Sequence, residues 1–155
     1  MEMSFLSIRA ATDNPQTPFS PHNGSGAWRL PGVGHSYSSL PGKAHAGLCR
    51  AVWELNPVDE GDGGTIFITG SHKANFDSPA DAASADSELW STYSCPAGSL
   101  ILFTEATSHS GVPWTNMERD RVAVFSECSP LQPRGATVSS RLHVAAMRLE
   151  FIGQL

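Results

Sequence analysis

The chain has 155 residues, a length that suits one domain around one hydrophobic core. It carries 10 basic and 15 acidic residues, for a net charge of −5, and no basic stripe, which argues against nucleic acid or an anionic membrane as its partner. Because no apolar run approaches the ~20 residues of a membrane span, and the N-terminus lacks the pattern of a signal peptide, we expect a cytoplasmic protein. Fourteen glycines and eleven prolines favour a β-rich fold over a helical bundle.

The first part of the chain is predicted to be loop-rich. Residues 13–46 contain repeated Pro and Gly signals, and none of their apolar runs exceeds a few residues. Residues 47–55 (GLCRAVWEL) then predict a strand, 59–64 (DEGDGG) an acidic turn, and 64–70 a second strand rich in β-branched and aromatic residues. We expect these two strands to form a hairpin.

Further strands are predicted along the rest of the chain. Residues 74–88 are poor in bulky apolar side chains and are expected to form a surface insertion. Strands are predicted at 89–94, 99–105 and 121–127, and helical spacing of apolar residues behind a serine predicts a short terminal helix at 139–151.

The order of these motifs resembles a known family. The stretch VWELNPVDEGDGGTIFITGSHKANF, followed by AGSLILFTEATSHSGVPWTNMERDRVAVF, resembles the phytanoyl-CoA dioxygenase family of Fe(II)/2-oxoglutarate oxygenases. The similarity covers roughly residues 45–130 of a single domain, 1–155. It implies an all-β, double-stranded β-helix (a jelly roll) with the metal between its two sheets. The family usually has further N-terminal elements, so we expect a fold completed by a missing N-terminal segment or by a partner.

The resemblance assigns roles to a histidine and an arginine near the end of the core. His109 would be the distal iron ligand, and Arg121 would bind the far carboxylate of 2-oxoglutarate, since arginine presents a planar fork that matches a carboxylate. Arg119 is an alternative, because the loop is about one residue longer than is usual in the family. The competing interpretation of Arg121 is a surface ion pair with Glu118 or Asp120. An inward guanidinium with no acid beside it would mark a site for a bound anion.

The first iron ligand is less clearly defined. The family's H-x-D motif is missing, and the chain contains no H-x-D or H-x-E. His22 lies in a glycine-rich segment similar to a stretch found in some family members, and we favour it narrowly over His35. His35 has the usual distance to the following strand but would place Tyr37 at the carboxylate position. His45 is expected to be a wall residue.

Two sources for the third metal position remain open. His22-Asn23-Gly24 resembles the H-x-G arrangement of related iron halogenases, in which a missing carboxylate leaves a position for halide. Alternatively, Glu105 could supply the carboxylate, since it lies four residues before His109 and would share its face if the strand continued.

The sequence therefore predicts an Fe(II)- and 2-oxoglutarate-dependent oxygenase that hydroxylates a small organic substrate. The alternative is a non-catalytic jelly roll, either a pseudoenzyme or a binding module, which the missing H-x-D motif favours.

Overall fold

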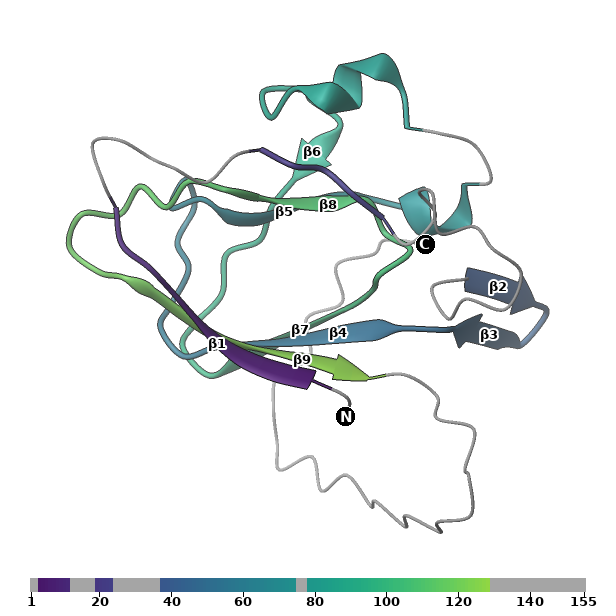
Figure 1. Cartoon of the computed structure of the whole chain (residues 1–155), viewed down its shortest axis with the longest axis horizontal. Coiled ribbons are helices and arrows are strands. Elements are labelled where there is room, and N and C mark those ends of the chain that lie inside the picture. The colour runs from purple at the N-terminus through teal and green to yellow at the C-terminus, as the bar shows by residue number, and fades with distance from the viewer. Residues whose placement is uncertain (1–2, 12–18, 24–36, 75–77, 129–155) are drawn as a thin grey trace, which may run out of the picture.

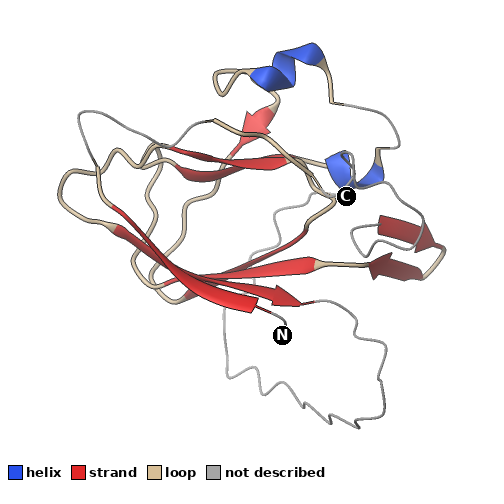
Figure 2. Cartoon of the chain, in the orientation of Figure 1, coloured by secondary structure: helices blue, strands red, loops and turns tan. Residues whose placement is uncertain are grey.

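The computed structural model describes residues 3–11, 19–23, 37–74 and 78–128. Two antiparallel sheets face each other, and a small hairpin lies at one end (Figure 1). Within the described residues, regular structure consists of strands and two short 3-10 helices (Figure 2). This architecture confirms the all-β, jelly-roll class predicted from the sequence.

The larger sheet, here called the four-stranded sheet, has the order β1-β9-β4-β7. Its strands are β1 (Met3–Arg9), β4 (Cys49–Glu54), β7 (Ser99–Thr104) and β9 (Arg121–Cys128). The three predicted strands among these, at 47–55, 99–105 and 121–127, are present with ends that differ by one or two residues. Their alternating inward and outward side chains are typical of strands with one buried face.

The facing sheet, here called the three-stranded sheet, has the order β6-β5-β8. Its strands are β5 (Gly64–Ile68), β6 (Trp90–Ser91) and β8 (His109–Val112). In β5, Phe67 points between the sheets and lies opposite His109 of β8. Residues 19–23 run along the other side of β8 and make one β-bridge to it, between His22 and His109.

The hydrophobic core lies between the two sheets. Its most buried side chains are Val52, with 1% of its surface exposed, and Ala123, with 0%. The rest of the cluster is Val58, Phe67, Tyr93, Cys95, Ile101 and Trp114. Removing these apolar surfaces from water is the main stabilising contribution of the sandwich, and it holds the two inner faces at a fixed separation.

The expected hairpin between residues 47–55 and 64–70 is wrong. β4 pairs with β7 and β9, whereas β5 pairs with β6 and β8, so the acidic turn connects the two sheets instead of two neighbouring strands. Asp62 closes this turn by accepting a hydrogen bond of 2.9 Å from the backbone of Asp59. Gly63 has a φ of +92°, and a Cβ there would lie 2.0 Å from the carbonyl oxygen of Pro113.

Other expectations for individual segments need correction. The prediction of loop for residues 13–46 is wrong at its end, where β2 (Tyr37–Leu40) and β3 (Lys43–Ala46) form a hairpin. Residues 89–94 contain only the two-residue strand β6. The segment 74–88 contains a 3-10 helix, η2 (Ala80–Ala83), which follows η1 (Ser71–Lys73). The predicted helix at 139–151 lies outside the described residues.

None of the described helices is long and apolar enough to cross a membrane.

Candidate metal centre

His22 and His109 lie side by side between the sheets at one end of the sandwich. The backbone N–H of His22 donates to the carbonyl of His109 at 3.0 Å, and the N–H of His109 donates to the carbonyl of His22 at 2.9 Å. Residues that face each other in such a bridge project their side chains to the same face, and the two ring centroids are 4.3 Å apart. His109 is buried, whereas His22 is exposed.

Both imidazole rings are held in the same way by the backbone. Nδ1 of His22 lies 2.9 Å from the carbonyl oxygen of Ser20, and Nδ1 of His109 lies 2.8 Å from that of Thr107. Because a carbonyl oxygen can only accept, Nδ1 is the nitrogen that carries the proton in the neutral form of each ring, and Nε2 in that form presents a lone pair. A backbone acceptor on the second nitrogen is the usual support of a metal-binding histidine.

The charge state of His109 also suits a metal ligand. Burial lowers the pKa of His109 below its ordinary value, and this effect outweighs the hydrogen bond to Thr107 and the nearby charge of Glu105, which both raise it. The ring is therefore neutral at neutral pH, the form in which imidazole binds metals.

Glu105 supplies a carboxylate at the same place. Its Oε2 lies 3.8 Å from Nε2 of His109, and one ligand atom from each of His22, Glu105 and His109 lies within 4.8 Å of the other two. Glu105 reaches this position from the turn between β7 and β8, so the strand continuation that first suggested it does not exist. The turn brings the chain from one sheet to the other and places the acid between them.

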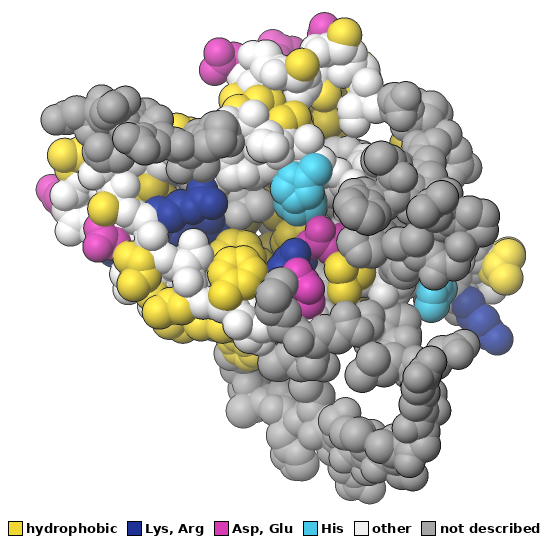
Figure 3. All heavy atoms as spheres, in the orientation of Figure 1, with side chains coloured by type: hydrophobic (Ala, Val, Ile, Leu, Met, Phe, Trp, Pro, Cys, Tyr) yellow, Lys and Arg dark blue, Asp and Glu magenta, His cyan; other side chains and the backbone are white. Residues whose placement is uncertain are grey.

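Arg50 fixes the carboxylate of Glu105. Its Nε donates to Oε1 of Glu105 at 2.7 Å, and its Nη1 lies 2.7 Å from Oε1 of Glu127. These contacts leave Oε2 of Glu105 directed toward the histidines. Figure 3 shows histidine, acidic and basic side chains gathered with hydrophobic ones on this face of the molecule.

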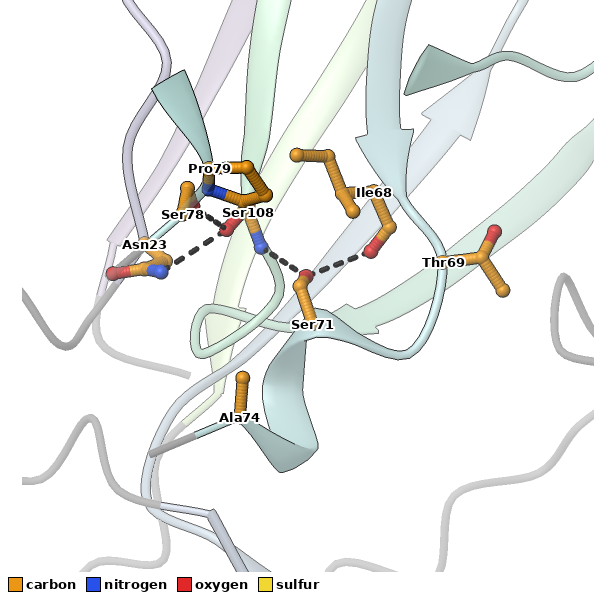
Figure 4. A pocket seen from close by; sticks show the side chains of 8 residues that line it. All are labelled: Asn23, Ile68, Thr69, Ser71, Ala74, Ser78, Pro79 and Ser108. Carbon is orange, nitrogen blue, oxygen red and sulfur yellow. Dashed lines mark hydrogen bonds between the residues drawn. The ribbon is translucent and has the colours of Figure 1, made fainter. Parts of the chain in front are cut away.

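A small pocket is lined in part by Asn23 and Ser108, the residues next to the two histidines in the sequence (Figure 4). It has a volume of about 200 Å³ and is lined by Asn23, Ile68, Thr69, Ser71, Ala74, Ser78, Pro79 and Ser108. Asn23 follows one histidine and donates to Oγ of Ser108, which precedes the other, at 3.0 Å. Ser71 accepts the backbone N–H of Ser108 at 2.7 Å and donates to the carbonyl of Ile68 at 2.7 Å. This network braces the bridge that brings the two rings together.

The donor set fits a divalent transition metal. Two imidazole nitrogens and one carboxylate are the protein ligands of the 2-His-1-carboxylate site of non-heme iron enzymes. Of the three upstream histidines considered, the structure brings His22 to His109. His45 is exposed on β3, and His35 lies outside the described residues.

Arg121 is buried between the sheets, where it is already neutralised. Its Nε donates to both carboxylate oxygens of Glu54 at 3.2 Å, and its Nη2 donates to Glu54, to Tyr93 at 2.9 Å and to Thr65 at 3.1 Å. Burial alone would lower the pKa of Arg121, but the bond to Glu54 raises it above its ordinary value. The competing interpretation of a surface pair is wrong, and the condition for an anion site, an inward arginine without an acid, is not met.

Arg119 lies in the loop between β8 and β9, beyond the end of β8 that is remote from His109. Its Nη2 contacts Asp59 at 2.7 Å and Asp62 at 3.2 Å, and its carbonyl accepts a bond of 2.6 Å from the indole of Trp114. These contacts close the loop onto the acidic turn.

The sequence reasoning missed the residues that hold these groups in place, notably Arg50 and Glu54. The available signal was the presence of charged residues in the apolar strand CRAVWE, because a buried charge requires a partner of opposite charge.

Solved structures share this fold. HygX from Streptomyces hygroscopicus, with nickel and 2-oxoglutarate bound, aligns with a TM-score of 0.64 at 23% identity over 82% of this chain and 56% of HygX. ThoJ, a non-heme monooxygenase in a nickel complex, aligns with a TM-score of 0.51 at 16% identity over 80% of this chain and 41% of ThoJ. The chain has the fold of these proteins. AviO1 from Streptomyces viridochromogenes Tue57 aligns with a TM-score of 0.56 at 14% identity, over 84% of this chain and 52% of AviO1.

The chain therefore spans about half the length of these proteins. No family model matches the chain, and no curated protein matches it.

Proposed function

We propose that this chain is an Fe(II)- and 2-oxoglutarate-dependent oxygenase, similar to the phytanoyl-CoA dioxygenase family, that hydroxylates a small organic substrate. The observation that carries the proposal is the cluster of His22, Glu105 and His109, whose three ligand atoms come from different segments and meet between the sheets. HygX, which shares the fold, has been solved with iron and also with nickel, 2-oxoglutarate and hygromycin B. A cytoplasmic location remains a prediction from the sequence.

The chain's own residues prepare this site for iron. Ser20 and Thr107 hold the two Nδ1 protons on their carbonyls, so that both Nε2 lone pairs face the same space. Arg50 orients the carboxylate of Glu105 through its hydrogen bond to Oε1. Iron bound here would supply the activation of dioxygen, coupled to oxidative decarboxylation of 2-oxoglutarate. Phe67 and Phe103, whose rings lie 6.4 and 4.9 Å from that of His109, keep water from the inner side of the site.

Glu105 also bears on the two alternatives. A halogenase-like site needs a position without a carboxylate, and Glu105 supplies one within 4.8 Å of both histidines. A pseudoenzyme was favoured by the missing H-x-D motif, but the turn after β7 offers an acid that this motif does not describe. The geometry therefore supports the oxygenase best.

Anaerobic loading with Fe(II), followed by measurement of iron per chain, tests the proposal. We expect about one iron per chain in the wild type and almost none in His109→Ala or in Glu105→Ala, since each removes one of three ligands. His45→Ala, which changes an exposed histidine on β3, is the matched control and should load fully.

Loaded protein is then mixed with 2-oxoglutarate and oxygen, and succinate is measured. A wild type that binds no iron would refute the proposal. Full loading of Glu105→Ala would remove Glu105 from the site and restore the halogenase-like arrangement as the better alternative.

A further inference from the structure

Arg9 is a cation on the inner face of the four-stranded sheet. It is the last residue of β1 and lies directly opposite Arg121 of β9, whose buried side chain faces the other sheet. Leu6 and Ile8, with 56% and 61% of their surfaces exposed, occupy the outer face of β1, so the alternation of the strand directs Arg9 inward.

The side chain of Arg9 crosses to the three-stranded sheet. Its Nη1 lies 3.5 Å from the carbonyl oxygen of Val112, a long and weak hydrogen bond. A Cβ on Gly111 would lie 2.8 Å from the same nitrogen. The guanidinium therefore occupies the space that a side chain at residue 111 would otherwise fill.

Arg9 differs from Arg121 in having no counter-charge among the residues that the structure describes. Glu54 neutralises Arg121, but no carboxylate oxygen lies within 4.0 Å of Arg9 in the part of the chain that the structure describes. Burial lowers the pKa of Arg9 below its ordinary value, and the adjacent charge of Arg121 lowers it further. A partly buried cation under this repulsion would be stabilised by an anion from outside the chain.

The position of Arg9 relative to the candidate metal centre suggests which anion it would bind. Gly111 follows His109 by two residues on β8, so both face the space between the sheets, and the two positions are about 7 Å apart along the strand. A five-carbon dicarboxylate held at one end by the metal would extend along β8 toward Gly111. Because residue 111 has no side chain, the guanidinium of Arg9 lies over it, where it would meet the far carboxylate.

We infer that Arg9 binds the distal carboxylate of 2-oxoglutarate, and that Arg121 is a structural residue neutralised by Glu54. The inference rests on the proposed function, because it assumes that the keto-acid end of the co-substrate is bound at His22, Glu105 and His109. Arginine at this place offers two parallel N–H donors to a carboxylate, which a lysine cannot reproduce.

Titration of 2-oxoglutarate into the anaerobic Fe(II)-loaded protein, followed by the charge-transfer absorption band, tests the inference. Arg9→Met should weaken 2-oxoglutarate binding by about 30-fold or more, because it removes one partner of a desolvated charge pair. Iron content should remain that of the wild type, since Arg9 contacts none of the three metal ligands. Lys43→Met, which removes one exposed positive charge on β3, is the charge-matched control and should leave binding unchanged.

A second co-substrate gives a readout that does not depend on a variant. 2-Oxopentanoate has the same keto-acid end but lacks the distal carboxylate, so the wild type should bind 2-oxoglutarate more tightly by a similar factor. Arg9→Met should lose most of this preference. Gly111→Ala should also weaken 2-oxoglutarate binding with normal iron content, because its methyl group displaces the guanidinium.

The outcomes separate this inference from the proposed function. A wild type that fails to bind iron refutes the proposed function itself. Iron and 2-oxoglutarate binding equal to the wild type in both Arg9→Met and Gly111→Ala refutes only the role of Arg9. If Arg9→Met also loses iron, the role of Arg9 is tested by Gly111→Ala and by the wild type's preference for 2-oxoglutarate over 2-oxopentanoate. Normal 2-oxoglutarate binding in Gly111→Ala together with no such preference would refute it.

Discussion

Replacing Glu54 with Gln should destabilise the protein more than most single substitutions. Glu54 has 0% of its surface exposed and accepts bonds from Arg121 and Tyr93, so glutamine would leave a buried guanidinium without a counter-charge. Breaking such a pair by changing one partner costs about 3–5 kcal/mol. At about 2–4 °C per kcal/mol for a chain of this size, the Tm should fall by roughly 6–20 °C.

Thermal and urea unfolding of the metal-free protein measure this effect. Asp59→Asn is the matched control, since it removes a carboxylate from a pair with Arg119 that faces solvent, and it should change the Tm far less. The double variant with Glu54→Leu and Arg121→Met, in which neither charge of this pair remains, should be more stable than Glu54→Gln. A Tm for Glu54→Gln close to that of the wild type would show that Arg121 is neutralised by another group, and our account of this pair would be wrong.

Three further predictions concern pH and backbone geometry. Burial raises the pKa of Tyr93, so above about pH 10 the unfolded chain loses this proton before the folded chain does. Urea unfolding should therefore show a free energy of unfolding that falls with rising pH, and the fall should be less steep in Tyr93→Phe than in the wild type. Burial lowers the pKa of His109, so the free energy of unfolding of the metal-free protein should fall as the pH drops below about 6.5. In urea unfolding at neutral and at acidic pH, this decrease should be smaller for His109→Gln than for the wild type. Gly63→Ala should lower the Tm more than Gly61→Ala: both glycines have positive φ, but only a Cβ at residue 63 meets the backbone of Pro113.

The strands that the sequence predicted well are those whose own side chains fill the core. β5, β7 and β9 are rich in Val, Ile, Leu and Phe, and β4 contains Val52 and Trp53; runs of such residues indicate a strand without knowledge of its neighbours. β8, with the sequence HSGV, is polar and contains glycine. It is a strand because β5 pairs with it, and pairing between distant segments cannot be read from composition.

The same limit applies to the site. His109 and Arg121 were proposed from the order of motifs, but the choice between His22 and His35 depended on which backbone segment lies beside β8. Glu105 was proposed because a strand continuing from residue 105 to 109 would place it on the same face as His109. That strand does not exist, and a turn brings Glu105 to the histidines instead. The partner of Arg121 was sought among its sequence neighbours, whereas the structure provides it 67 residues earlier.

The order of the four-stranded sheet also constrains how the chain can fold. Its edge strand β1 is the first in the sequence, and among the described strands its one partner is β9, the last of them, with Met3 opposite Glu127. During synthesis β1 therefore cannot pair with β9 until almost all of the described core strands have been synthesised. Such long loop closures slow folding, and until they are complete the apolar side chains Phe5, Leu6 and Ile8 are available to other chains. We expect slow refolding and a yield that falls with protein concentration.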